Sequence, residues 1–170
     1  MLRRLFGRLT DRQPRGAGLF AAVVAEARAP EWYRDGQVPD TIDGRFAVLS
    51  TVAALTTVRL ESAGDSGRLA SVALTERFVE AMDAEHRQLG MGDPSVGKKV
   101  RKLVGLLGER VEQWTQAVNG ADWTSAAEDS LYRGKAPSDA ALQSNVQRLR
   151  MLWSRLQATP IDEIAEGRIA

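Results

Sequence analysis

The sequence predicts an all-α fold in a single domain, a helical bundle of about six helices. Apolar residues recur at helical spacing along most of the 170 residues, and the segments with this pattern are joined by short connections. No segment has a convincing strand pattern. With 44% hydrophobic and 26% charged residues, a chain of this length can bury a sizeable core.

Three helices are predicted in the first half of the chain. The first covers residues 16–28 and ends before a proline; a connector follows at 31–40, and we expect its tryptophan and tyrosine to pin it to the core. The second, residues 41–62, is apolar on nearly all sides in its first half, which predicts a central position. Its β-branched residues would also suit a strand, but the segment is too long for one. After a loop at 63–67, the third helix covers residues 69–89.

The second half of the chain is predicted to contain three further helices. The fourth begins at Asp93, has a proline at its first position and continues to about residue 118. A short helix at 123–132 follows an Asn-Gly break, and the last long helix covers 138–158, followed by a tail at 161–170 with room for one further turn. Side chains that can cap three of these helices stand at their starts: Asp40 or Thr41, Asp122, and Ser138 or Asp139.

These elements divide the chain into a basic N-terminal tail at 1–15, a helical domain at 16–158 and a C-terminal tail at 159–170. The N-terminal tail sets arginines among apolar residues: Arg3, Arg4, Arg8, Arg12 and Arg15 with Leu2, Leu5, Phe6 and Leu9. One interpretation is a solvated tail that docks loosely on the domain, as terminal segments often do. The other is contact with an anionic membrane surface. The first is preferred.

Composition and charge restrict the compartment and the partners. No apolar run approaches the roughly 18 residues of a membrane span, and the N-terminus lacks the apolar core of a secretory signal. The absence of cysteine suits a reducing compartment. A net charge of +1 argues against a polycation that coats nucleic acid. We therefore expect a cytoplasmic protein, with any peripheral contact at the inner face of the cytoplasmic membrane.

No pattern in the sequence argues for catalysis. His86 is the only histidine, so neither a histidine zinc site nor a convincing catalytic triad is predicted. Residues 92–98 match the G-x-x-x-x-G-K part of a phosphate-binding loop, but Lys99 stands where Ser or Thr is needed, and a helix rather than a strand precedes the motif. We expect no catalytic residue, no metal ligand and no cofactor.

The most distinctive feature is a corner between the third and fourth predicted helices. Acidic and basic residues end the third helix: Asp83, Glu85, His86 and Arg87. Basic residues open the fourth: Lys98, Lys99, Arg101 and Lys102. Charge alone favours an intramolecular salt-bridge corner, with Asp83 and Arg87 paired one turn apart. The functional alternative is a docking patch for an acidic or membrane-apposed partner. Specific nucleic-acid binding is not expected, because no aromatic residues interleave the lysines.

The same corner carries a family resemblance. It contains a G-x-G-D turn followed by V-G-K and further basic residues, matched by Asp83, Arg87, Gly90, Gly92, Asp93, Val96, Gly97, Lys98 and Lys102. An A-R-x-P-x-[WF]-Y segment lies at 27–33, a V-P-D-T-x-D-G-R-F segment at 38–46, and Leu-Tyr-Arg at 131–133. In these blocks the chain resembles the ubiquinol-cytochrome c chaperone family, over about residues 19–133. Met91, where the family often has valine, and Pro94 are mild departures.

The resemblance implies a non-enzymatic assembly factor of the cytochrome bc1 complex, respiratory complex III, in a bacterial version. Such a protein would bind newly made cytochrome b and hold it until the other subunits join. Relatives in mitochondria work with a small second protein near the ribosome exit. The expected partner-facing edge consists of Asp83, Arg87, Asp93, Lys98, Lys99 and Lys102.

Two other classes of function stay open on the sequence. One is a small helical enzyme or ligand-binding protein with a cleft between the second and third helices, which a deep polar pocket would support; a shallow, charged, convex surface would favour the chaperone. The other is a ribosome- or nucleic-acid-associated module, whose binding would fall steeply with salt. The oligomeric state does not follow from the sequence.

Overall fold

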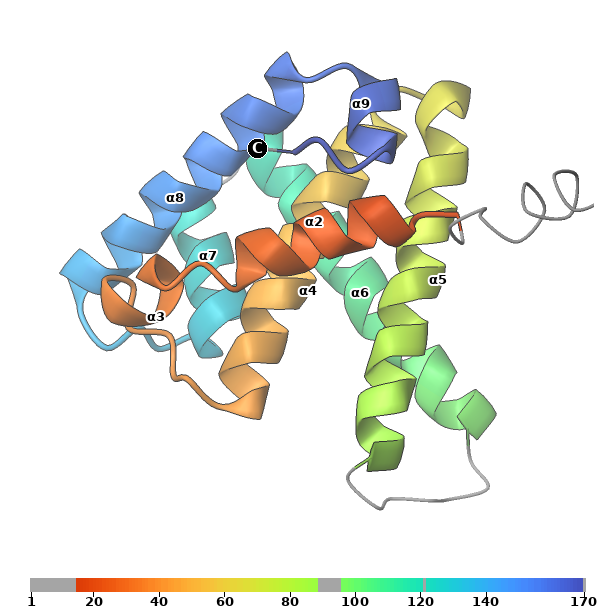
Figure 1. Ribbon diagram of the computed structural model, residues 1–170. Coiled ribbons are helices and arrows are strands. Elements are labelled where there is room, and N and C mark those ends of the chain that lie inside the picture. The colour runs from red at the N-terminus through yellow and green to blue at the C-terminus, as the bar shows by residue number, and fades with distance from the viewer. Residues whose placement is uncertain (1–14, 89–95, 121, 170) are drawn as a thin grey trace, which may run out of the picture.

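The computed structural model describes residues 15–88, 96–120 and 122–169, and these form an all-α structure, as predicted (Figure 1). The helices are α2 (Ala17–Ala27), α3 (Glu31–Arg34), α4 (Ile42–Glu61), α5 (Asp65–Gln88), α6 (Val96–Val118), α7 (Trp123–Tyr132), α8 (Asp139–Ala158) and α9 (Ile161–Ala165). Within the described residues, no helix is both long and apolar enough to cross a membrane.

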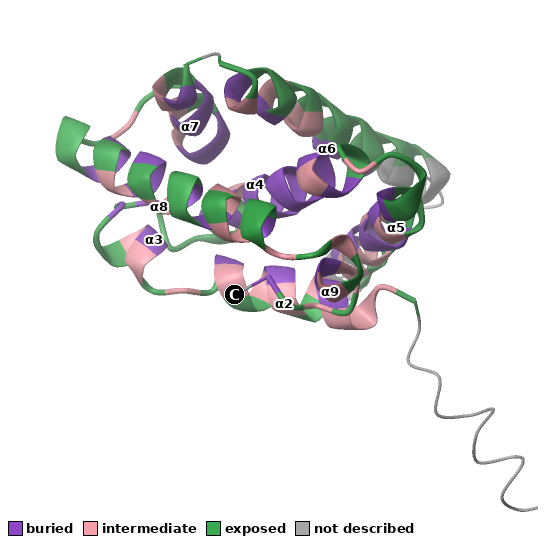
Figure 2. Ribbon diagram, turned by 90° about the horizontal axis from the view of Figure 1, so that it is seen from above, coloured by how far each residue is buried: buried purple, intermediate pink, exposed green. Residues whose placement is uncertain are grey.

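Helix α4 lies at the centre of the bundle, which confirms the position predicted for it. It contacts α2, α5, α6, α7 and α8, and 12 of its 20 residues are buried (Figure 2). Its buried hydroxyls donate back to the carbonyl one turn earlier: Thr51 Oγ1 to Ala47 at 2.7 Å and Thr56 Oγ1 to Val52 at 2.9 Å. These bonds satisfy the hydroxyls of Thr51 and Thr56, whereas the buried Thr57 Oγ1 has no partner among the described residues, so most of the β-branched run is compatible with a buried helix here.

The helix starts also follow the sequence. The Thr41 hydroxyl accepts a hydrogen bond from the Gly44 N–H at 3.2 Å, and Ser138 accepts one from the Ala141 N–H at 3.2 Å. The Asp122 carboxylate accepts one from the Thr124 N–H at 2.8 Å. Each bond satisfies a backbone donor that has no partner inside its helix.

Two element predictions are wrong. The connector at 31–40 contains the one-turn helix α3, although its Trp32 is buried in the core and its Tyr33 packs against the core, as expected. Helix α5 begins at Asp65, so the residues expected as a loop up to Gly67 include its first turn. A Cβ at position 67 would overlap the carbonyl oxygen of Leu60. Glycine therefore stands there because the end of α4 passes close by, and it does not break the helix.

The C-terminal segment contributes to the core. Within residues 159–169, helix α9 packs against α5 and α2, and Ile164 and Ile169 are buried among the core residues. The largest fully buried side chains include Trp32, Trp114, Phe78, Leu149 and Ile164. Elements from both ends of the chain thus close over α4.

Candidate functional site

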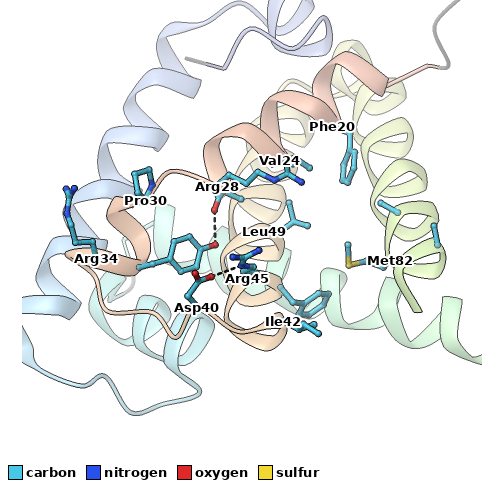
Figure 3. Close-up of a pocket in the computed structure, with 15 residues that line it drawn as sticks. Phe20, Val24, Arg28, Pro30, Arg34, Asp40, Ile42, Arg45, Leu49 and Met82 are labelled. Carbon is cyan, nitrogen blue, oxygen red and sulfur yellow. Dashed lines mark hydrogen bonds and ion pairs between the residues drawn. The ribbon is translucent and has the colours of Figure 1, made fainter. Parts of the chain in front are cut away.

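A groove of approximately 1070 Å³ opens between α2, α3, the first half of α4 and the second half of α5 (Figure 3). Its walls are largely apolar, from residues on three helices: Phe20, Val24 and Ala27 on α2, Ile42, Phe46 and Leu49 on α4, and Ala81, Met82 and Ala84 on α5. We call this set, together with the polar residues described next, the α2–α4–α5 groove.

The α4 wall of the groove is an apolar stripe that the core covers only in part. Ile42, Phe46 and Leu49 are spaced one turn apart on one side of the helix. Ile42 is 61% exposed, while Phe46 and Leu49 are partly buried and pack against the core. The Phe46 ring lies 6.0 Å from that of the buried Phe78, which fixes its position. An exposed isoleucine on a rigid helix, continuous with partly buried apolar residues, is typical of a binding surface.

Cations surround this apolar lining. Arg45 Nε lies 2.6 Å from Asp40 Oδ1, and the hydrogen bond lowers the pKa of Asp40. Arg34 forms two 2.8 Å hydrogen bonds with Asp35. Arg28 is exposed and has no ion pair among the described residues. The groove lining therefore holds three arginines and one aspartate, and of these arginines Arg28 alone lacks a paired carboxylate among the described residues.

The hydroxyl of Tyr33 helps to hold α3 against the C-terminal end of α2, at the edge of the groove. It donates to the Ala27 carbonyl at 3.0 Å, and burial raises its pKa. The neighbouring Trp32 Nε1 donates to the Glu26 carbonyl at 3.0 Å. These two bonds satisfy carbonyls at the C-terminal end of α2 and hold α3 against it. The backbone that carries Arg28 and Arg34 is therefore held in place by these bonds.

Distant residues hold the segment that leads into α4. The Tyr132 hydroxyl on α7 donates to the Gly36 carbonyl, and Asn145 Nδ2 on α8 donates to the same carbonyl at 3.3 Å and to Tyr132 at 2.6 Å. Arg133 pairs with Asp43 in the first turn of α4 at 2.8 Å. The groove wall is thus tied to the opposite end of the chain.

The structure describes the predicted partner-facing edge only in part. Asp83 on α5 is partly exposed and has an interaction partner; it lies between the groove residues Met82 and Ala84 in sequence. Lys98 and Lys102 are exposed one turn apart on α6, which packs against α5.

The remaining predicted residues of that edge cannot be placed. Asp93 lies outside the described residues, as do the side chains of Arg87 and Lys99, whose backbones belong to α5 and α6. The structure therefore tests neither the salt-bridge corner nor the docking patch.

Comparison with known proteins gives the family. The family model described as ubiquinol-cytochrome C chaperone matches residues 34–170. The chain belongs to this family. The crystal structure of the Cbp3 homolog from Brucella abortus superimposes with a TM-score of 0.79 at 24% sequence identity, over 100% of this chain and 96% of that chain. That likeness shows a shared fold. No curated protein matches the chain.

In this family member, the sequence blocks that carry the resemblance meet at the groove. Residues 27–33 supply Ala27, Arg28, Pro30 and Tyr33 to its lining, and residues 38–46 supply Asp40, Ile42, Arg45 and Phe46. The block at 131–133 supplies Tyr132 and Arg133, which hold the groove wall. The fourth block begins at Asp83, next to the α5 wall.

A cleft between the helices at 41–62 and 69–89 was expected only for the ligand-binding alternative; a groove does lie between these helices and α2, but its apolar lining was not predicted. The feature of the sequence that could have indicated it is the one-turn spacing of Ile42, Phe46 and Leu49, which extends the apolar surface of α4 to its first, exposed turn. The groove matches neither of the two expected surfaces, which were a shallow, charged, convex surface for the chaperone and a deep polar pocket for the ligand-binding alternative. It is hollow rather than convex, and its lining is mainly apolar, without a convergent set of polar groups. The described residues contain no group of three metal-ligating side chains.

Proposed function

We propose that this family member is an assembly chaperone of the cytochrome bc1 complex that holds newly made cytochrome b in the α2–α4–α5 groove. The observation that carries the proposal is the apolar stripe of Ile42, Phe46 and Leu49, which lines an open groove although Phe46 and Leu49 also pack against the core. A membrane subunit that has not yet joined its partners exposes apolar segments, and an apolar groove is a suitable receptor for one such segment.

Charge gives the groove a preferred ligand. Arg28 has no ion pair among the described residues, and Arg34 and Arg45 stand on the same rim in exposed pairs with Asp35 and Asp40. A client segment that ends in a carboxylate or a run of acidic residues would pair with this rim while its apolar part lies on Ile42 and Phe46. The rim would thus fix the register of the segment and the lining would supply most of the affinity.

The basic corner is proposed to extend this surface. Asp83, Arg87, Asp93, Lys98, Lys99 and Lys102 would form a partner-facing edge next to the α5 wall. Cytochrome b lies in the membrane, so its chaperone meets it at the membrane face. Exposed lysines such as Lys98 and Lys102 favour an anionic leaflet. We place the protein on the cytoplasmic side, in peripheral contact with the inner face of the cytoplasmic membrane.

Co-purification of cytochrome b from detergent-solubilised membranes tests the proposal. Ile42→Asp should reduce the amount captured at least about tenfold, because the client would bury an unpaired carboxylate. Met151→Asp is the matched control: Met151 is 51% exposed on α8, away from the groove. Both variants should unfold within about 0.5 kcal/mol of the parent protein.

Charge reversal separates the two parts of the surface. Lys98→Glu with Lys102→Glu should weaken capture several-fold, with a steep dependence on salt, since rim charges act mainly through long-range attraction. If Ile42→Asp captures as much cytochrome b as the Met151→Asp control, the groove is not the binding site. Unchanged capture by the double lysine variant would make the corner merely structural.

A further inference from the structure

The N-terminal end of the described structure lies against α5. Gly16 precedes α2 with a φ of 77°, and a Cβ there would lie 2.9 Å from the Cβ of Ala73 on α5. Helix α2 packs against α5 in the same region (Figure 1). The described chain therefore starts beside Ala73, in the first half of α5, and this is the point to which residues 1–14 are joined.

The outer face of α5 next to Ala73 is both apolar and acidic. Leu69 is 76% exposed and Val72 is 51% exposed, one turn apart. Asp65, Glu76 and Glu80 share their side of the helix by its 3.6-residue period. We call Asp65, Leu69, Val72, Glu76 and Glu80 the α5 stripe.

The carboxylates of the α5 stripe are available to a cationic ligand. Glu76 is exposed and has no ion pair among the described residues. The Asp65 side chain is 98% exposed, at 3.8 Å from Arg68. Glu80 pairs with Arg77 at 2.8 Å but is itself 57% exposed. Surface pairs of this kind contribute little and exchange readily for other partners.

The composition of residues 1–14 complements the α5 stripe. The segment contains four apolar residues of suitable size, Leu2, Leu5, Phe6 and Leu9, and four arginines against one aspartate. Fourteen residues would span roughly 21 Å as a helix, and the two ends of the α5 stripe lie roughly 11–12 Å along the helix from Ala73, so every member of the stripe is within reach. The apolar residues, the charge and the length of residues 1–14 are therefore all compatible with binding to the α5 stripe.

We propose that residues 1–14 dock on the α5 stripe of their own chain, with the leucines and Phe6 against Leu69 and Val72 and the arginines facing Glu76 and Glu80. The alternative place on this molecule is the α2–α4–α5 groove, which is also apolar. Among the described residues, its lining includes the unpaired Arg28 and a single carboxylate, Asp40, which already pairs with Arg45, whereas the α5 stripe carries Glu76, which has no ion pair. Docking on the α5 stripe thus leaves the groove open for a client.

Paramagnetic broadening in the full chain tests the proposal, because a chain without cysteine accepts a single engineered label. A nitroxide at Arg68→Cys lies beside the α5 stripe without removing any member of it. We expect it to broaden the amide signals of residues 2–9 at least threefold more than a nitroxide at Met151→Cys on α8. Equal effects from the two labels would overturn the proposal.

Charge reversal and mixing identify the occupant. Glu76→Lys with Glu80→Lys should reduce the broadening from position 68 at least twofold, whereas Glu109→Lys with Glu112→Lys, exposed on α6, should leave it unchanged. Broadening that appears only when isotope-labelled and nitroxide-labelled chains are mixed would assign the stripe to a second copy and contradict the proposal. So would signals of residues 2–9 that respond to phosphatidylglycerol vesicles but never to the label at 68.

Discussion

Two arginines illustrate how the molecule divides its charges between structure and surface. Arg110 on α6 is largely buried, and its Nη1 donates to Thr51 Oγ1 at 2.8 Å, to the Ser130 carbonyl at 2.6 Å and to the Ala47 carbonyl at 3.4 Å. Burial lowers the pKa of Arg110 to about 10, so it remains charged at neutral pH. Arg28, at the end of α2, is exposed on the groove rim and has no ion pair among the described residues.

The difference between these residues lies in what their donors already bind. Arg110 joins α6 to α4 and α7 through neutral oxygens, without a carboxylate among its described partners. Its charge serves the fold. Arg28 keeps its donors for solvent or for a ligand. The α4–α6–α7 junction is therefore closed and the α2–α4–α5 groove is open, and substitutions in the two regions should have different consequences.

The largest expected effect is at the closed junction. Arg110→Ala removes three hydrogen bonds and leaves the oxygens of Thr51 and Ser130 without this donor, so the free energy of unfolding should fall by about 2–4 kcal/mol. Arg28→Ala should change it by less than about 0.5 kcal/mol. Urea denaturation measures both. Equal losses for the two variants would abolish the distinction between a closed and an open region.

A smaller effect is expected at Tyr132, which ties α7 to the segment that leads into the α4 wall of the groove. Tyr132→Phe removes the hydroxyl that bonds the Gly36 carbonyl and accepts from Asn145, at a cost of about 1–2 kcal/mol. Because the segment entering α4 is then held less firmly, hydrogen exchange should accelerate around residues 38–44 and client capture should fall a few-fold. Loss of stability with unchanged exchange in this segment would show that the groove wall does not depend on Tyr132.

The smallest effect is expected on the exposed face of α6. A Cβ at Gly105 or Gly108 would meet no atom within 4 Å, so Gly105→Ala and Gly108→Ala should each raise the free energy of unfolding by about 0.5–1 kcal/mol through helix propensity. Thermal unfolding measures the gain. Client capture should not change; a clear loss would place a binding surface on this face of α6 and extend the open region beyond the groove.

The sequence predicts those features that depend on neighbours along the chain. The buried position of α4 follows from its being apolar on nearly all sides, and the caps at Thr41, Asp122 and Ser138 follow from local hydrogen bonding. Gly67 shows the limit of such reasoning. A glycine that reads as a loop signal lies inside α5, because the reason for it is the carbonyl of Leu60 on another helix.

The candidate site could not be predicted either, because it also depends on contacts between helices that are distant in the sequence. Its lining comes from α2, α4 and α5, and no local pattern says that Phe20, Ile42 and Met82 face one groove. The bonds of Arg110 and Tyr132 join residues between 20 and 96 positions apart, so they depend on the tertiary fold. The motif blocks could be recognised one by one, but their meeting at the groove required the structure.

The most direct test of the central claim is the accessibility of the groove when a client is bound. Because the chain lacks cysteine, Ile42→Cys and Met151→Cys each provide one thiol for maleimide labelling. Captured cytochrome b should slow labelling at position 42 at least about tenfold and leave position 151 unchanged. Equal labelling rates at position 42 with and without the client would contradict the claim that the α2–α4–α5 groove holds it.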